Sequence, residues 1–274
     1  MSTVLLPRSL HEKPWGRIGI PSCFEAGTSK IGEAWFDNPE HPLPLLVKWL
    51  FTSERLSIQV HPDDQQARLL GLPSGKEEWW LVVDAKPGAC LGIGTTRPLD
   101  AVALQQAARD GSLEHLMEWR PVRRGDWFHV PPGTVHAIGA GVTLVEIQQY
   151  TDATFRLYDY GRPRELHLDV GVGVSRAGPY TDSRHGSVSL DGRLRPGVLS
   201  SCGHFEIILG CGPEAQPDRT GPAWIIPLRG CMRMTDFDVL PGNVAFGILG
   251  NKAIYTNDFI ALFAFASADT FYST

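Results

Sequence analysis

The stretch DWFHVPPGTVHAIGAGVTLVEIQQY, residues 126–150, decides the fold that we expect. In an extended chain, Trp127 and His129 project to one face. Phe128 and Val130 project to the opposite face, and glycine-containing turns follow. The stretch therefore predicts short strands joined by tight turns.

The composition supports the same fold class. The chain has 274 residues, with 29 glycines and 21 prolines. At about 150 residues per domain, this length gives one large or two small domains. So many turn-forming residues, without a fixed repeat, favour an all-β core of short strands over long helices.

Charge and hydropathy exclude several classes of partner. The net charge of −5 provides no global positive field for nucleic acid or an anionic membrane. The longest apolar stretch, 259–266, is far shorter than the roughly 18 residues that span a bilayer. Residues 1–15 lack the apolar region of a signal peptide, so we expect a cytoplasmic protein. The 5 cysteines form no C-x-x-C pair and are expected to be reduced thiols.

The remaining pattern predicts further strands and two helices. Residues 45–51 and 56–60 form a hairpin candidate, and residues 78–83 form a central strand. Between 98 and 119, Asp100 and Ser112 are each placed to cap a short helix. We expect a boundary near 170–200, followed by strands at 204–209, 224–228, 243–249 and 259–264.

Three short patches carry candidate metal ligands. Gln59 and His61 lie two residues apart on an extended segment, so their side chains leave the same face. Glu78 and His136 stand at strand ends near glycine turns. Two imidazoles, a carboxylate and an amide suit zinc, and manganese or iron is also acceptable. A lone strand histidine is more often structural, and this spacing alone names no reaction.

A family resemblance gives the patches a more definite meaning. Several blocks of sequence between residues 13 and 169 resemble type I mannose-6-phosphate isomerases in their short bacterial form. They follow one another in the same order as in that family. They are KPWG (13–16), IGEAW (31–35), PLLVK (44–48), LSIQVHPDD (56–64), GKEEWW (75–80), GDWFHVPPGTVHAIGAG (125–141), VEIQQYTDATFRLYDYGR (145–162) and RELHLD (164–169).

The resemblance implies a fold, a cofactor and an activity. The expected fold is an all-β cupin (jelly-roll) double barrel with a short helical insertion. It divides into a catalytic domain over 1–175, with the insertion near 98–119, and a metal-free second domain over 176–274. One zinc ion per chain would be held by the residues that match the family ligands: Gln59, His61, Glu78 and His136. The family interconverts mannose 6-phosphate and fructose 6-phosphate through a cis-enediol.

The resemblance also suggests catalytic residues. Lys76 precedes Glu78 by two residues and should face the same cavity, where it could stabilise an enediolate or, with a depressed pKa, act as a base. Outside this motif it would be read as a solvated turn lysine. Arg156 matches an arginine suited to charge stabilisation, and Asp152 matches an acidic residue linked to proton transfer. The base stays open between Lys76, Asp152 and metal-bound water.

Candidate substrate contacts are less specific. Lys48 would favour an anionic substrate if it faces inward, and Ser57 matches a serine near the phosphate. Arg162 and its neighbour Arg164 either line a phosphate pocket or pair with nearby acidic residues such as Asp159. We expect a small phosphosugar as partner and either a monomer or a homodimer.

The chain also departs from the family pattern. Gly75 stands where long members have a histidine before the lysine. The C-terminal part has a cupin-like turn, VLPGNVAFG at 239–247, without a following histidine, and His185 and His204 are interpreted as structural. Two rival hypotheses remain: a sugar-binding or regulatory cupin with little turnover, and an iron-dependent cupin oxidoreductase. Lys76 and Arg156 favour the isomerase, and the amide of Gln59 counts against the oxidoreductase.

Overall fold

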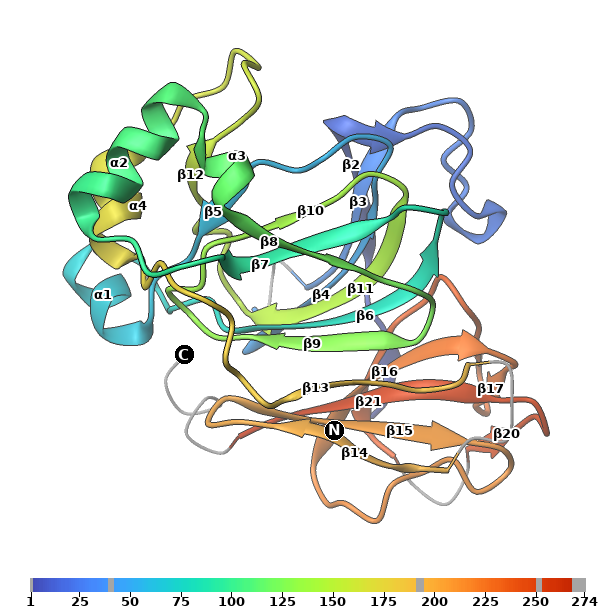
Figure 1. Ribbon diagram of the computed structural model, residues 1–274. Coiled ribbons are helices and arrows are strands. Elements are labelled where there is room, and N and C mark those ends of the chain that lie inside the picture. The colour runs from blue at the N-terminus through green and yellow to red at the C-terminus, as the bar shows by residue number, and fades with distance from the viewer. Residues whose placement is uncertain (1, 39–41, 191–194, 250–252, 268–274) are drawn as a thin grey trace.

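The fold is a stack of antiparallel sheets with helices on one outer side (Figure 1). The computed structural model describes residues 2–38, 42–190, 195–249 and 253–267. The cupin-like all-β architecture expected from the sequence is confirmed.

Two sheets form the first barrel. The seven-stranded sheet has the order β13-β9-β6-β11-β4-β3-β2, and the five-stranded sheet the order β12-β5-β10-β7-β8. The strands of the first are β2 (Arg8–Arg17), β3 (Ile31–Phe36), β4 (Leu45–Phe51), β6 (Glu78–Ala85), β9 (Asp126–Val130), β11 (Val142–Gln149) and β13 (His185–Ser187). Those of the second are β5 (Ile58–Val60), β7 (Cys90–Thr95), β8 (Met117–Pro121), β10 (His136–Ile138) and β12 (Phe155–Tyr158).

Two further sheets form the remaining layers. The six-stranded sheet has the order β1-β19-β16-β21-β15-β14, and the three-stranded sheet the order β18-β17-β20. Their strands are β1 (Val4–Leu5), β14 (Gly197–Ser201), β15 (Phe205–Cys211), β16 (Pro222–Arg229), β17 (Met232–Arg233), β18 (Asp238–Val239), β19 (Ala245–Ile248), β20 (Ile254–Tyr255) and β21 (Ile260–Ala266). The helices are the 3-10 turn η1 (Ser22–Phe24) and α1 (Asp64–Leu69), α2 (Ala101–Asp110), α3 (Leu113–Leu116) and α4 (Leu168–Val174).

Hydrophobic clusters fill the spaces between successive layers. One cluster packs the helices against the five-stranded sheet, and a second, with Trp80 and Ile93, lies between the two sheets of the first barrel. The largest joins the seven-stranded sheet to the six-stranded sheet through residues such as Trp79 and Phe205. Trp79 and Trp80 thus serve different cores, because neighbouring strand residues point to opposite faces.

Local sequence patterns explain most elements, with two corrections. Asp100 caps α2, since its side chain accepts a hydrogen bond from the Ala103 amide. Ser112 makes no such bond at the start of α3, so the prediction that it caps a helix is wrong. The hairpin predicted from residues 45–60 is also wrong, because β4 pairs with β3 and β11 while β5 pairs with β10 and β12.

The two halves of the chain exchange strands. Val4 and Leu5 of β1 pair with β19, so the first strand belongs to the six-stranded sheet. In return, β13 pairs with β9 and extends the seven-stranded sheet. The division into 1–175 and 176–274 stays a prediction, and the halves share strands as well as a core.

Candidate metal centre

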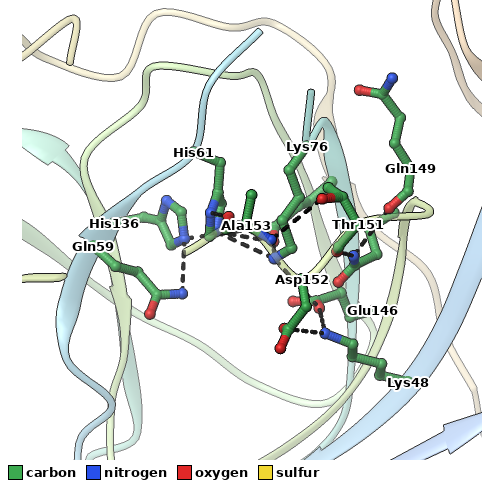
Figure 2. A network of polar contacts seen from close by, with 12 residues as sticks. Lys48, Gln59, His61, Lys76, His136, Glu146, Gln149, Thr151, Asp152 and Ala153 are labelled. Atoms are coloured by element: carbon green, nitrogen blue, oxygen red, sulfur yellow. Dashed lines mark hydrogen bonds and ion pairs between the residues drawn. The ribbon is translucent and has the colours of Figure 1, made fainter. Parts of the chain in front are cut away.

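The candidate metal ligands meet between the two sheets of the first barrel (Figure 2). His61 directly follows β5, Glu78 opens β6 and His136 opens β10. Their ligand atoms all lie within 4.8 Å of one another, and all three side chains are buried. Glu78 Oε1 is 3.2 Å from His61 Nε2, and Glu78 Oε2 is 3.7 Å from His136 Nε2.

Backbone carbonyls orient both imidazoles. His61 Nδ1 donates to the carbonyl oxygen of Ala153 at 2.7 Å, and His136 Nδ1 donates to that of Thr134 at 2.9 Å. Each ring therefore presents Nε2 to the cluster, as metal-binding histidines commonly do. Burial lowers the pKa of both histidines; with the nearby charge of Lys76, it brings the pKa of His61 to about 3. Both rings are accordingly neutral and able to coordinate.

Gln59 reaches the cluster from the middle of β5. Its Nε2 lies 3.4 Å from His136 Nε2, while its Oε1 accepts a hydrogen bond from Ser57 Oγ at 3.1 Å. The amide would have to turn over for its oxygen to serve as a ligand. Ser57, predicted near the phosphate, thus contacts Gln59 and also lines the adjoining cavity.

Lys76 extends into the same buried space. Its ammonium lies 3.2 Å from His61 Nε2 and pairs closely with Glu78 Oε1. Burial alone would lower the pKa of Lys76, but the negative charges of Glu78 and Glu146 outweigh it and raise that pKa above its ordinary value. The ammonium is therefore charged in this arrangement, contrary to the depressed pKa that a basic role would require.

Glu146 is a buried carboxyl that sequence reasoning missed. Its Oε1 lies 4.0 Å from Lys76 Nζ and 3.8 Å from Lys48 Nζ, and its Oε2 accepts from the Trp80 indole. Burial and the charge of Glu78 raise the pKa of Glu146 to about 7. The available signal was an acidic residue on the buried strand VTLVEIQQ, where a lone carboxyl needs partners.

An open cavity adjoins the cluster and is lined mostly by polar groups. Five residues predicted to contact substrate or take part in catalysis line it: Lys48, Ser57, Lys76, Asp152 and Arg156. Gln59, Glu146 and Arg164 also line it, together with Lys13, Trp15, Glu33, Leu50, Leu56, Ile138 and Thr154.

The cationic residues of the cavity differ in their partners. Lys48 is buried, faces the Trp35 ring at 4.2 Å and lies 3.7 Å from Asp152 Oδ1. Arg156 donates to the neutral carbonyl oxygen of Glu165. Arg164 also lines the cavity, but both oxygens of Asp159 accept its hydrogen bonds.

Arg162 lies in a network of acidic and carbonyl partners. Its guanidinium donates to Asp159, to Glu54 and to the carbonyl oxygen of Arg55. It is not among the described residues that line the cavity. The alternative that the sequence left open, pairing with a nearby acidic residue, is the one observed.

Layered antiparallel sheets that enclose two histidines and a carboxylate define a cupin-type protein with a candidate metal centre. The family model for phosphomannose isomerase type I, catalytic domain, matches residues 25–78. The chain is 38% identical over 170 residues to a mannose-6-phosphate isomerase of Streptococcus mutans, covering 60% of this chain and 53% of that protein. It is 38% identical over 149 residues to the mannose-6-phosphate isomerase ManA of Bacillus subtilis, covering 52% and 47%.

Solved structures show the same fold over nearly the whole chain. A mannose 6-phosphate isomerase from Bacillus subtilis aligns with a TM-score of 0.74 at 24% identity, over 97% of this chain and 100% of the other. A variant of the phosphomannose isomerase from Salmonella typhimurium aligns with a TM-score of 0.71 at 14% identity, over 97% and 100%. The resemblance to type I mannose-6-phosphate isomerases is confirmed, although the chain spans about half the length of the curated relatives it matches.

The described part of the chain also bears on membrane association. No helix within it has the length and apolar character needed to cross a bilayer.

Proposed function

We propose that this chain is a metal-dependent aldose–ketose isomerase of the cytoplasm that interconverts mannose 6-phosphate and fructose 6-phosphate through a cis-enediol. One observation carries the proposal: a buried His61–Glu78–His136 cluster lies beside a cavity lined by ionisable side chains, among them Lys76, which contacts His61. The names of the curated relatives support the same activity.

The donor set fits a divalent cation. Glu78 Oε2 is buried and accepts no hydrogen bond from the described residues, so the cluster has an acceptor without a donor. His61, Glu78 and His136, with Gln59 as fourth ligand, would hold one zinc ion, and other divalent metals suit these N/O ligands. Bound there, the cation would polarise the oxygens at C1 and C2 of the sugar.

Isomerisation moves a proton between C1 and C2 while negative charge develops on the oxygens. A carboxylate can take the proton from one carbon and return it to the other. Glu146 is suited to this task because it is buried beside Lys76 and Lys48, and burial raises its pKa toward neutrality. Asp152, the predicted acidic residue, is 65% exposed and would act nearer the mouth.

Lys76 and Arg156 would stabilise charge. The raised pKa of Lys76 favours an ammonium that donates to an enediolate oxygen over a basic role. Arg156, whose Nη1 donates to a backbone carbonyl, would bind an enediolate or phosphate oxygen. Lys48 and Ser57, which also line the cavity, would complete the substrate contacts.

A coupled isomerase assay on mannose 6-phosphate and on free mannose tests the proposal. We expect turnover of the phosphosugar that disappears with a chelator and returns with zinc. Glu146→Gln should lower kcat about 100-fold or more, because it removes the proton carrier but keeps a similar shape. Arg109→Ala, on the exposed side of α2, is the matched control and should leave the rate unchanged.

The rival hypothesis of a sugar-binding cupin makes a different prediction. Purified protein that holds a full equivalent of metal and binds the phosphosugar, yet turns over neither sugar, would contradict the isomerase and support that rival.

A further inference from the structure

A second polar cluster lies on the opposite face of the seven-stranded sheet. Side chains alternate where the chain enters β6, so Lys76 and Glu78 point into the barrel while Glu77 points toward the six-stranded sheet. There Glu77 Oε1 lies 2.6 Å from His129 Nε2, and Glu77 Oε2 lies 2.5 Å from His204 Nδ1. His204 belongs to the loop between β14 and β15, in the C-terminal half (Figure 1).

His204 also contacts a second carboxylate. Its Nε2 lies 2.9 Å from Asp64 Oδ2, so one imidazole bridges Asp64 and Glu77. Hydrogen bonds with Cys202 and Glu77 raise the pKa of His204 to about 11. An imidazolium carries N–H donors on both nitrogens, as a bridge between two carboxylates requires.

The bridged carboxylates belong to two ligand-bearing segments. Asp64 lies three residues after His61, and Glu77 immediately precedes Glu78. Asp64 Oδ1 accepts from the Gly75 amide at 2.8 Å, and the Lys76 amide donates to the Pro62 carbonyl at 3.0 Å. The two segments are therefore joined directly on one side and through His204 on the other.

Gln149 completes the connection. Its Nε2 donates to Asp64 Oδ1 at 3.0 Å, and its Oε1 accepts from the Glu77 amide at 3.0 Å. Asp64 is thus tied by hydrogen bonds to the segment that carries Lys76 and Glu78, and Glu77 is part of that segment. A displacement of His204 would act on both walls of the candidate metal centre.

We propose that His204 is a positioning residue through which the C-terminal half holds the His61 and Glu78 segments at the separation that metal binding requires. The proposal deepens the proposed function in that it uses the same metal centre, but it concerns metal affinity and not turnover. It gives the C-terminal half a role that its lack of recognisable motifs left open.

The test is the affinity of the metal-stripped protein for Co²⁺, measured by competition with a chelator. We expect His204→Ala to weaken Co²⁺ binding about 10- to 100-fold, the range seen when groups that orient metal ligands are removed. The matched control is His185→Ala, which removes another histidine that links the C-terminal half to β9 but does not contact Glu77. This control should bind Co²⁺ like the unaltered protein.

Rescue separates positioning from general stability. His204→Arg retains a cation with several donors and should recover part of the affinity. If His204→Ala fails to fold, His204→Gln is used instead. Glutamine can donate a hydrogen bond to one carboxylate, but it carries no positive charge with which to bridge two. A lower melting temperature with unchanged Co²⁺ affinity would overturn the proposal.

Metal stoichiometry provides a second decisive reading. Ligand atoms of Glu77, His129 and Cys202 also lie within 4.8 Å of one another. One Co²⁺ per chain supports the hydrogen-bonded bridge. Two per chain, with the second lost in Cys202→Ala, would overturn it by placing a metal where the bridge is proposed. Because Co²⁺ binding is read without substrate, a chain that fails as an isomerase can still pass this test.

Discussion

At the scale of single residues, the candidate metal centre depends on a close backbone approach at Gly75. A Cβ at this position would lie 2.6 Å from the backbone of both Asp63 and Asp64. Such distances are below van der Waals contact, and the backbone there has no flexible end that can move aside. Glycine at position 75 is therefore required by packing in this chain.

Gly75→Ala should consequently weaken both folding and metal binding. We expect a loss of about 1–3 kcal/mol in the free energy of unfolding, as for other overpacked sites, measured by urea denaturation. Gly173→Ala in α4 is the control, since its Cβ would meet nothing within 4 Å. Alanine there should be neutral or stabilising by up to about 1 kcal/mol. Equal losses in both variants would contradict this account.

The buried His61 gives the metal-free protein a defined pH dependence. Its pKa is about 3 in the folded chain and about 6.5 when unfolded, so the unfolded state binds more protons between these values. His61 thus contributes stability above pH 6.5 that is lost as the pH falls toward 3. Relative to His61→Gln, the unaltered chain should lose up to about 1.4 kcal/mol more per pH unit in this window.

Unfolding curves at pH 6.5, 5.5 and 4.5 check this slope. The same comparison with His115→Gln, an exposed position in α3, serves as control. Parallel curves for the unaltered chain and His61→Gln would show that His61 is not held neutral by the fold.

Local patterns, together with the family resemblance, singled out the residues that the structure brings together in the candidate metal centre. Lys76 and Glu78 share a face through the period of two, and glycine turns mark the strand end at His136. Glu146 was not predicted as a site residue. A single carboxyl in an apolar strand can be interpreted only once Lys48 and Lys76 are known to lie beside it.

At the scale of elements, the starts of α2 and α3 show that a residue type suited to capping a helix does not always cap it. Asp100 and Ser112 both precede helical segments and both can cap, yet only the Asp100 side chain is observed to accept a backbone hydrogen bond there. The backbone of Ser112 is already helical, with φ −65° and ψ −15°, so its side chain cannot reach back as an N-cap requires. The sequence alone does not give this angle.

The two caps should therefore differ in energy. Asp100→Ala is expected to cost about 1 kcal/mol of stability, and Ser112→Ala only a few tenths. Urea denaturation of both variants measures the difference. A comparable loss at Ser112 would show that it caps α3 in solution.

The mistaken hairpin between residues 45 and 60 has a physical cause as well. Two apolar runs around a polar turn satisfy the local rule for a hairpin, but each run finds better partners in a different sheet. Strand pairing depends on long-range contacts that turn residues do not encode. The longer strands β15, β16, β19 and β21 of the C-terminal half were predictable, since each is a bounded apolar run, whereas the short strands β17, β18 and β20 were not predicted.

At the scale of the whole molecule, the largest hydrophobic core belongs to both halves. Trp79 and Val145 of the seven-stranded sheet pack in one cluster with Phe205 and Trp224 of the six-stranded sheet. Neither half can bury these surfaces alone. The full chain should therefore unfold in a single calorimetric transition, despite the two domains predicted from its sequence.

The isolated fragment 1–175 provides the matching experiment. We expect it to lack a cooperative transition and to bind a hydrophobic dye, because it exposes the face of the seven-stranded sheet that packs on β15 and β16. Two separate transitions in the full chain, or cooperative unfolding of the fragment, would show that the halves are independent domains.

The pairing of β1 with β19 sets the order of events during synthesis. Val4 is translated long before its partner Phe246, because the two paired residues lie in opposite halves of the chain. Until β19 has been translated, β1 has no edge of that strand to join. Closing so long a loop also slows folding, because its entropy is lost before the contact forms. The β1 segment is thus one that chaperones would meet early and release only after β19 has been translated.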